Sequence, residues 1–227
     1  MTWLLLAVVV LALVFGPMLW VRWVMAHYHT EIPGMPGTGG ELAKHLVERF
    51  GLDVQVEQTE HGDHYDPEAR AVRLSEATYT NKSLTAVAVA AHEVGHALQH
   101  QHQDRRLALR TALVPIANRI ARVSAAFMWA APVIGLLTRH PVPFSMLVLV
   151  GMAGLVGRML VHLVTLPTEF DASFNRALPV LTEGQYIAPG EEPAVRRILR
   201  AAALTYVAAA LADILNLARW AALLLRR

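Results

Sequence analysis

Long apolar stretches are the feature that most limits what this sequence can fold into. Residues 1–21 contain no charged side chain, and the apolar run continues past Arg22 to Met25. Three further apolar blocks follow along the chain, at residues 112–137, 144–166 and 201–225. A helix needs about 20 apolar residues to cross a bilayer. The sequence therefore predicts a mainly α-helical membrane protein with about four transmembrane or membrane-docked helices.

The composition supports this interpretation and excludes several classes of protein. Hydrophobic residues make up 55% of the 227, and charged residues only 17%, against about 25% in a soluble globular chain. A wholly soluble or disordered protein is therefore not expected. The absence of cysteine excludes disulfides, thiolate zinc sites, iron–sulfur clusters and cysteine nucleophiles. A net charge of +2, spread along the chain, gives no nucleic-acid surface.

The blocks divide the chain into five parts with a predicted topology. We expect an N-terminal anchor (1–25), a polar region (26–111), a transmembrane hairpin (112–166), a polar segment (167–200) and a last transmembrane or docked helix (201–227). Counted from Arg22 at the end of the anchor, the side that holds the two polar parts carries thirteen Lys and Arg residues, against three on the opposite side. The positive-inside rule then places the polar parts in the cytoplasm and the N-terminus outside. Asp213 in the last block should face other helices, with Arg158 as a candidate partner.

The polar region should form a small α+β unit. The spacing of apolar residues predicts a helix over 41–50. Residues 54–56 and 71–74 alternate like strands, and the turn-rich HGDHYDP sequence between them predicts a hairpin with a long tip. An extended substrate is expected to add to the hairpin edge near residues 72–74. Ser83 is a suitable N-cap for a helix that runs to about His102.

That last helix carries the sequence HEVGH, with His92, Glu93 and His96. Residues four apart share one helical face, so both imidazoles can reach one metal ion while Glu93 serves as a general base. Gly95 costs about 1 kcal/mol in a helix and suggests that something packs closely there. A catalytic zinc needs a third protein ligand. Candidates are His100, His61, His64 and the acids of residues 168–173, of which Glu169 is favoured because the hairpin returns it to the same interface.

Several stretches resemble one known family. They are DHYDP (63–67), VRLSE (72–76), AVAAHEVGHALQH (88–100), TLPTEFDAS (165–173), RAL (176–178) and AAALTYVAAA (201–210). Together they look like the YugP-like family of membrane zinc metallopeptidases, and the match covers nearly the whole chain. The resemblance implies a cytoplasm-facing, zincin-like catalytic region with one Zn²⁺ per chain. It is similar in layout to the HtpX-like and CaaX-processing proteases. By matching position it makes His92, His96 and Glu169 the ligands and Glu93 the base. This chain departs from the usual family pattern at Thr168 and Asn175.

Other residues are weaker candidates for roles in the same reaction. Arg176, His64 or Tyr65 could stabilise a developing oxyanion. The alternative is that Arg176 pairs with an acid and that the DHYDP sequence is only a turn. Asp171 could orient a ligand histidine or form a salt bridge.

The sequence thus predicts a metalloendopeptidase in a bacterial-type cell membrane that acts on membrane or membrane-proximal polypeptides. Three rival hypotheses remain. An intramembrane protease would keep the HEVGH helix in lipid, and a non-catalytic adaptor would keep zinc for structure. A small transporter would use Arg158, His162 and Asp213 but would leave the HEVGH helix without a purpose.

Overall fold

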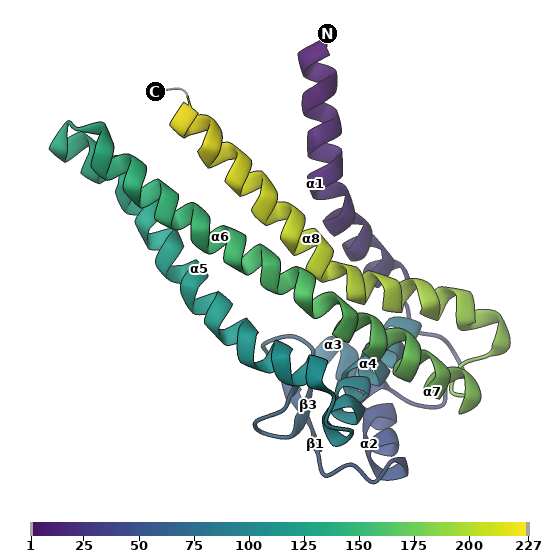
Figure 1. Ribbon diagram of the computed structural model, residues 1–227. Helices are drawn as coiled ribbons and strands as arrows, with labels where there is room; N and C mark the ends of the chain where they lie inside the picture. Colours follow the sequence, from purple (N-terminus) through teal and green to yellow (C-terminus); the bar gives the residue numbers. More distant parts are fainter. Residues whose placement is uncertain (1, 226–227) are drawn as a thin grey trace. The chain divides into compact units, whose positions relative to one another are not determined.

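The computed structural model describes residues 2–225, which are mainly helical with one small sheet (Figure 1). In chain order the elements are α1 (Thr2–His27), α2 (Gly39–Arg49), β1 (Gln55–Thr59), β2 (His64–Asp66), β3 (Ala71–Ser75), α3 (Glu76–Thr80), α4 (Leu84–Gln101), α5 (Arg105–Thr138), α6 (Pro141–Phe170), the π-helix η1 (Asp171–Ala177), α7 (Leu178–Glu183), the 3-10 helix η2 (Pro189–Glu191) and α8 (Glu192–Leu225).

These elements form two compact units. The first unit takes in Leu109–Thr165 and the described parts of Met1–Pro17 and Tyr206–Arg227. The second unit consists of Met18–Ala108 and Leu166–Thr205. The five-part division expected from the sequence stays a prediction.

Three helical stretches of the described chain are long and apolar enough to cross a membrane. They are Arg105–Thr138, Val142–Glu183 and Pro189–Ala222. The coarse prediction of a mainly helical protein with several candidate spans is therefore confirmed. The expected anchor over residues 1–25 includes Met1 and several side chains that lie outside the described residues, so it stays a prediction.

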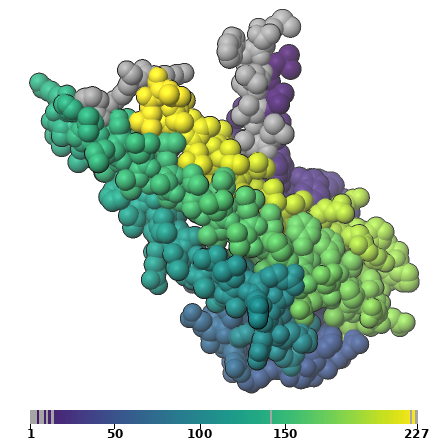
Figure 2. Space-filling model, viewed as in Figure 1, coloured from purple at the N-terminus to yellow at the C-terminus, as the bar shows by residue number. Residues whose placement is uncertain are grey.

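Small residues allow close helix packing in the first unit. A Cβ added at Gly154 of α6 would collide with the Ser124 side chain of α5. The position therefore favours glycine, which has no Cβ. Asp213 of α8 is fully buried and accepts a hydrogen bond from Arg158 Nε of α6 at 2.9 Å, as the sequence predicted. In Figure 2 the side chains of α6, in green, abut those of α8, in yellow.

The second unit is built around α4. Ser83 Oγ accepts a hydrogen bond from the Ala86 N–H at 3.2 Å, which confirms the predicted N-cap. The α2 helix packs on α4 and begins at a capping box formed by Thr38 and Glu41. Both predicted helices are thus present. Fifteen of the eighteen α4 residues are buried, so the functional sequence on this helix lies inside the fold.

The strand arrangement corrects one prediction. The expected hairpin is wrong, because β1 pairs with β3 in parallel, with Gln55 opposite Ala71. The intervening segment forms β2, which pairs antiparallel with β3 and gives the order β1-β3-β2. The Arg73 side chain of β3 stabilises this order, since it reaches Glu57 of β1 at 3.1 Å and Asp66 of β2 at 2.6 Å.

The same strand order contradicts the prediction that an extended substrate adds to the sheet near residues 72–74. Residues 72–74 belong to β3, which lies between β1 and β2 and has both of its edges paired. A substrate strand therefore cannot add there. Asp63 explains how the chain folds back, because its carboxylate accepts hydrogen bonds from the Ser75 N–H and from the Thr78 hydroxyl. These bonds hold the loop before β2 against the end of β3.

Candidate metal centre

Two histidines four residues apart form one side of the site. His92 and His96 lie on α4 with 4% and 1% of their surface exposed. Their rings meet edge to face with centroids 4.7 Å apart, as the shared helical face requires. Glu93, directly after His92, is also buried.

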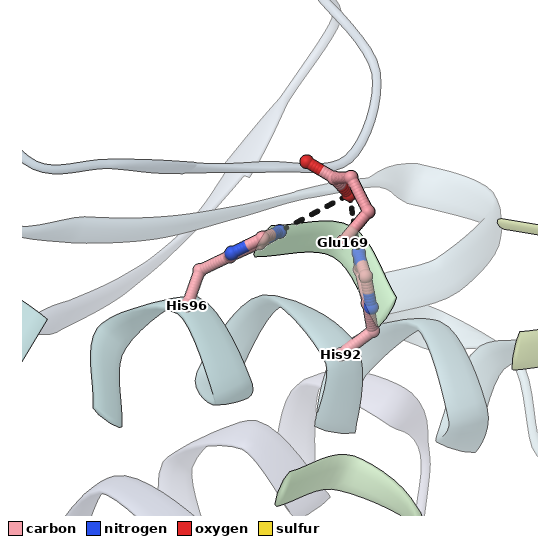
Figure 3. Close-up of side chains that lie close together, drawn as sticks. All are labelled: His92, His96 and Glu169. Carbon is pink, nitrogen blue, oxygen red and sulfur yellow. Dashed lines mark ion pairs between the residues drawn. The ribbon is translucent and has the colours of Figure 1, made fainter. Parts of the chain in front are cut away.

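Glu169, near the end of α6, forms the other side. It is 2% exposed, and its Oε2 lies 3.3 Å from His92 Nε2 and 3.4 Å from His96 Nε2. Figure 3 shows both rings turned toward this one carboxylate. Among the His, Cys, Asp and Glu residues of the described chain, these three form a group that could hold a metal ion, with ligand atoms within 4.8 Å of one another.

The donor set and its spacing fit zinc. Two imidazoles and one carboxylate are a known ligand set of catalytic zinc, which leaves the fourth position for water. Two ligand atoms that each lie about 2.0–2.1 Å from a tetrahedral zinc are about 3.3–3.4 Å apart. The two nitrogen–oxygen distances, 3.3 Å and 3.4 Å, equal that separation.

The backbone that follows Glu169 packs directly against the histidine helix. The chain continues from α6 into η1, a helix type that is frequent at functional sites. A Cβ added at Gly95 would lie 2.8 Å from the Ala172 carbonyl oxygen of η1. The prediction that something packs closely at Gly95 is therefore confirmed. This glycine lets the backbone that follows Glu169 touch α4.

The second ring nitrogen of each histidine also has a partner. His92 Nδ1 lies 3.0 Å from Ser173 Oγ, and that hydroxyl is 3.4 Å from the Leu199 carbonyl oxygen. His96 Nδ1 lies 2.9 Å from Gln99 Oε1. Such partners usually orient metal-binding imidazoles. In both rings Nε2 is the atom on the Glu169 side.

Asp171 lies at the centre of a polar network. Its carboxylate accepts hydrogen bonds from Gln99 Nε2 at 2.8 Å, Asn175 Nδ2 at 2.9 Å and Arg176 Nε at 3.0 Å. Arg106 Nη2 lies 3.2 Å from Asp171 Oδ1, the oxygen that Asn175 also reaches. The contacts of Asp171 agree with both hypotheses for it, because it forms salt bridges and also reaches the ligand histidine His96 through Gln99. Arg176 pairs with this acid, which was the alternative to a role in stabilising an oxyanion.

The candidates of the DHYDP sequence lie in a different hydrogen-bond network. His64 Nδ1 lies 2.8 Å from the Gly62 carbonyl oxygen, which is a local turn contact. The Tyr65 hydroxyl lies 2.7 Å from His100 Nδ1, and burial raises the pKa of this tyrosine. Within the described chain, His64 and His100 are outside the three-residue metal group.

Sequence reasoning missed Gln99 and Ser173. Gln99 follows His96 by three residues, so the i, i+3 spacing could have placed it beside that ring. Ser173 belongs to the TLPTEFDAS stretch and follows Glu169 by four residues. Nothing in the sequence indicates that a π-helix turns this serine toward His92.

Comparisons with known proteins agree with this chemistry. The model of a family described as "Putative neutral zinc metallopeptidase" matches residues 3–225. A relative from Bacillus subtilis (strain 168), named "Putative membrane protease YugP", is 40% identical over 186 residues, which cover 81% of this chain and 79% of that protein. No solved structure matches the chain.

Proposed function

The chain belongs to this family of neutral zinc metallopeptidases, and we propose that it is a membrane-anchored zinc metalloendopeptidase. The resemblance to the YugP-like family, predicted from the sequence, is confirmed. One observation carries the proposal: two buried imidazole nitrogens converge on a single carboxylate oxygen at 3.3 and 3.4 Å, next to the buried acid Glu93.

In the proposed mechanism His92, His96 and Glu169 would hold one zinc ion per chain. A zinc ion bound there would supply Lewis acidity that polarises a peptide carbonyl and lowers the pKa of a water molecule. Glu93 accepts the proton from the attacking water on its carboxylate and then delivers it to the leaving amine. Because Glu93 is 7% exposed, bulk water competes little for that proton.

The remaining candidates support the site or lie apart from it. The proposal assigns Arg176 no charge-stabilising step, since its guanidinium is engaged by Asp171 and its Nη1 lies 3.0 Å from His102 Nδ1. His64 and Tyr65 are likewise given no step in the chemistry.

The proposed substrates are membrane or membrane-proximal polypeptides, cleaved at the cytoplasmic face of a bacterial-type cell membrane. Support comes from the candidate spans and from the excess of Lys and Arg in the polar segments. The chain has no cysteine, so single cysteines can report the topology without background. Glu60→Cys should resist a membrane-impermeant maleimide in intact cells, while Arg139→Cys should react. The reverse pattern would contradict the proposed orientation.

The activity is tested with three purified proteins in detergent. The wild type should hold one zinc per chain and cleave a fluorescently labelled unfolded protein. Glu93→Gln should keep the zinc and lose about 10²–10⁴-fold in cleavage rate. Glu169→Ala should lose the zinc. Zinc retained without cleavage in the wild type would favour the adaptor hypothesis. Cleavage only within transmembrane segments would favour the intramembrane protease.

A further inference from the structure

Gln99 is a fully buried polar side chain to which the mechanism gives no role. It is 0% exposed and lies on α4. Its Oε1 lies 2.9 Å from His96 Nδ1. Its Nε2 donates to the Thr168 carbonyl oxygen at 2.9 Å and to Asp171 Oδ2 at 2.8 Å. The side chain therefore links one ligand histidine to the Thr168 backbone before Glu169 and to the Asp171 carboxylate after it.

The partners of Gln99 decide which of its two polar atoms faces the histidine. A backbone carbonyl oxygen can only accept, so the atom facing Thr168 must be the amide nitrogen. The side-chain oxygen of Gln99 then faces His96, and His96 Nδ1 must be the donor. In a neutral imidazole, a proton on Nδ1 leaves a lone pair on Nε2. That is the atom 3.4 Å from Glu169 Oε2.

The contact of the other histidine, His92, with Ser173 does not fix the tautomer of its ring. Ser173 Oγ lies 3.0 Å from His92 Nδ1, but a hydroxyl can donate as well as accept, so this contact alone does not select a tautomer. Gln99 has no such freedom, because both of its N–H bonds are committed to acceptors next to Glu169. Asp171 is in turn held by Asn175 and Arg176.

We propose that Gln99 is a positioning residue of the metal centre. It holds His96 as the Nδ1–H tautomer with Nε2 available to the metal, and it locks that orientation to the segment that carries Glu169. It acts through His96, the Thr168 carbonyl of α6 and the Asp171 carboxylate of η1, without touching the metal or the substrate. This inference rests on the proposed function, since it requires that His96 and Glu169 bind zinc.

The test measures zinc affinity by competition with a chromogenic chelator, using the full-length protein in detergent. Gln99→Met keeps the length of the side chain but removes all three hydrogen bonds. We expect zinc binding to weaken about 10–100-fold and the visible spectrum of the cobalt-substituted protein to change. The matched control is Thr78→Val, which removes the hydrogen bond that the buried Thr78 donates to Asp63, between two residues that are not proposed ligands. It should lower thermal stability and leave zinc affinity and the cobalt spectrum unchanged.

The outcomes separate this inference from the proposed function. If Gln99→Met loses only thermal stability, as the control does, Gln99 is merely structural and the inference is overturned while the peptidase proposal stands. A wild type that binds no zinc would contradict both. If Gln99→Met does not fold, ¹⁵N-histidine NMR of the zinc-loaded wild type decides. His96 should carry its proton on Nδ1 and bind zinc through Nε2, and ligation through Nδ1 would overturn the inference.

Discussion

Substituting Gly95 by Ala tests whether close contact between α4 and η1 holds the metal site together. The new Cβ would lie 2.8 Å from the Ala172 carbonyl oxygen, whereas ordinary contact begins at 3.4 Å. The neighbour is backbone and cannot rotate away, so η1 would have to retreat by about 0.6 Å. Metal–ligand distances tolerate only about 0.2 Å. Glu169 lies three residues before Ala172 on the same continuous helical segment and would move with it.

The expected magnitudes differ for stability and activity. Overpacking costs about 1–3 kcal/mol, and the better helix propensity of alanine returns about 1 kcal/mol, so the net loss of stability is about 0–2 kcal/mol. Misplacement of a zinc ligand by about 0.6 Å should lower zinc affinity and kcat/KM by about 10–100-fold. Activity should therefore fall much further than the stability change explains.

The assay combines chelator competition, hydrolysis of a labelled unfolded protein and thermal unfolding. Gly157→Ala is the matched control, because it is also a helical glycine but has nothing within 4 Å of its added Cβ. This control should keep the zinc affinity and the activity of the wild type. A Gly95→Ala protein with wild-type affinity and activity would refute the reasoning, since it would mean that η1 can move without disturbing Glu169.

Three further predictions concern a buried ion pair, an acid of the sheet and the removal of the metal. Asp213→Leu should destabilise the protein by about 3 kcal/mol, because it removes the acid that pairs with Arg158. Adding Arg158→Leu should restore most of the lost stability. Equal melting temperatures for the single and the double variant would contradict this. Hydrogen bonds from the Ala69 and Glu68 N–H groups and the nearby Arg73 hold the pKa of Asp66 below its usual value. The contribution of the Asp66 carboxylate to stability is therefore present above its pKa in the unfolded chain and is lost as the pH falls through its lower pKa in the folded protein. The difference in unfolding free energy between the wild type and Asp66→Asn should shrink below about pH 4. A difference that stays constant with pH would contradict this prediction. Removing the metal with a chelator should lower the melting temperature, because zinc at 100 times its Kd adds about 2.7 kcal/mol to the free energy of unfolding. The melting temperature of His96→Ala should change neither with the chelator nor with added zinc.

Features set by neighbouring residues could be predicted from the sequence. The α4 helix, its Ser83 cap and the shared face of His92 and His96 follow from spacings of three or four residues. Gly95 also gave a correct indication, because its cost in a helix pointed to a close neighbour. Placing Glu169 needed more, namely the hairpin argument and the resemblance to a family.

Features set by distant parts of the chain could not be predicted in the same way. The parallel pairing of β1 and β3 is supported by side-chain links such as Arg73 with Glu57, which strand alternation does not reveal. Nothing in the local sequence marks residues 171–177 as a π-helix, so the geometry that turns Ser173 toward His92 could not be predicted. Gln99 was missed because glutamine is common in helices, and its role depends on distant acceptors at the end of α6 and the start of η1.

The most direct test of the central claim is a structure of the wild-type protein with anomalous data collected at the zinc edge. The account predicts one anomalous peak per chain, about 2.0–2.2 Å from His92 Nε2, His96 Nε2 and a carboxylate oxygen of Glu169. A peak held by other residues, or a Glu169 carboxylate turned away from a metal bound by the two histidines, would contradict it.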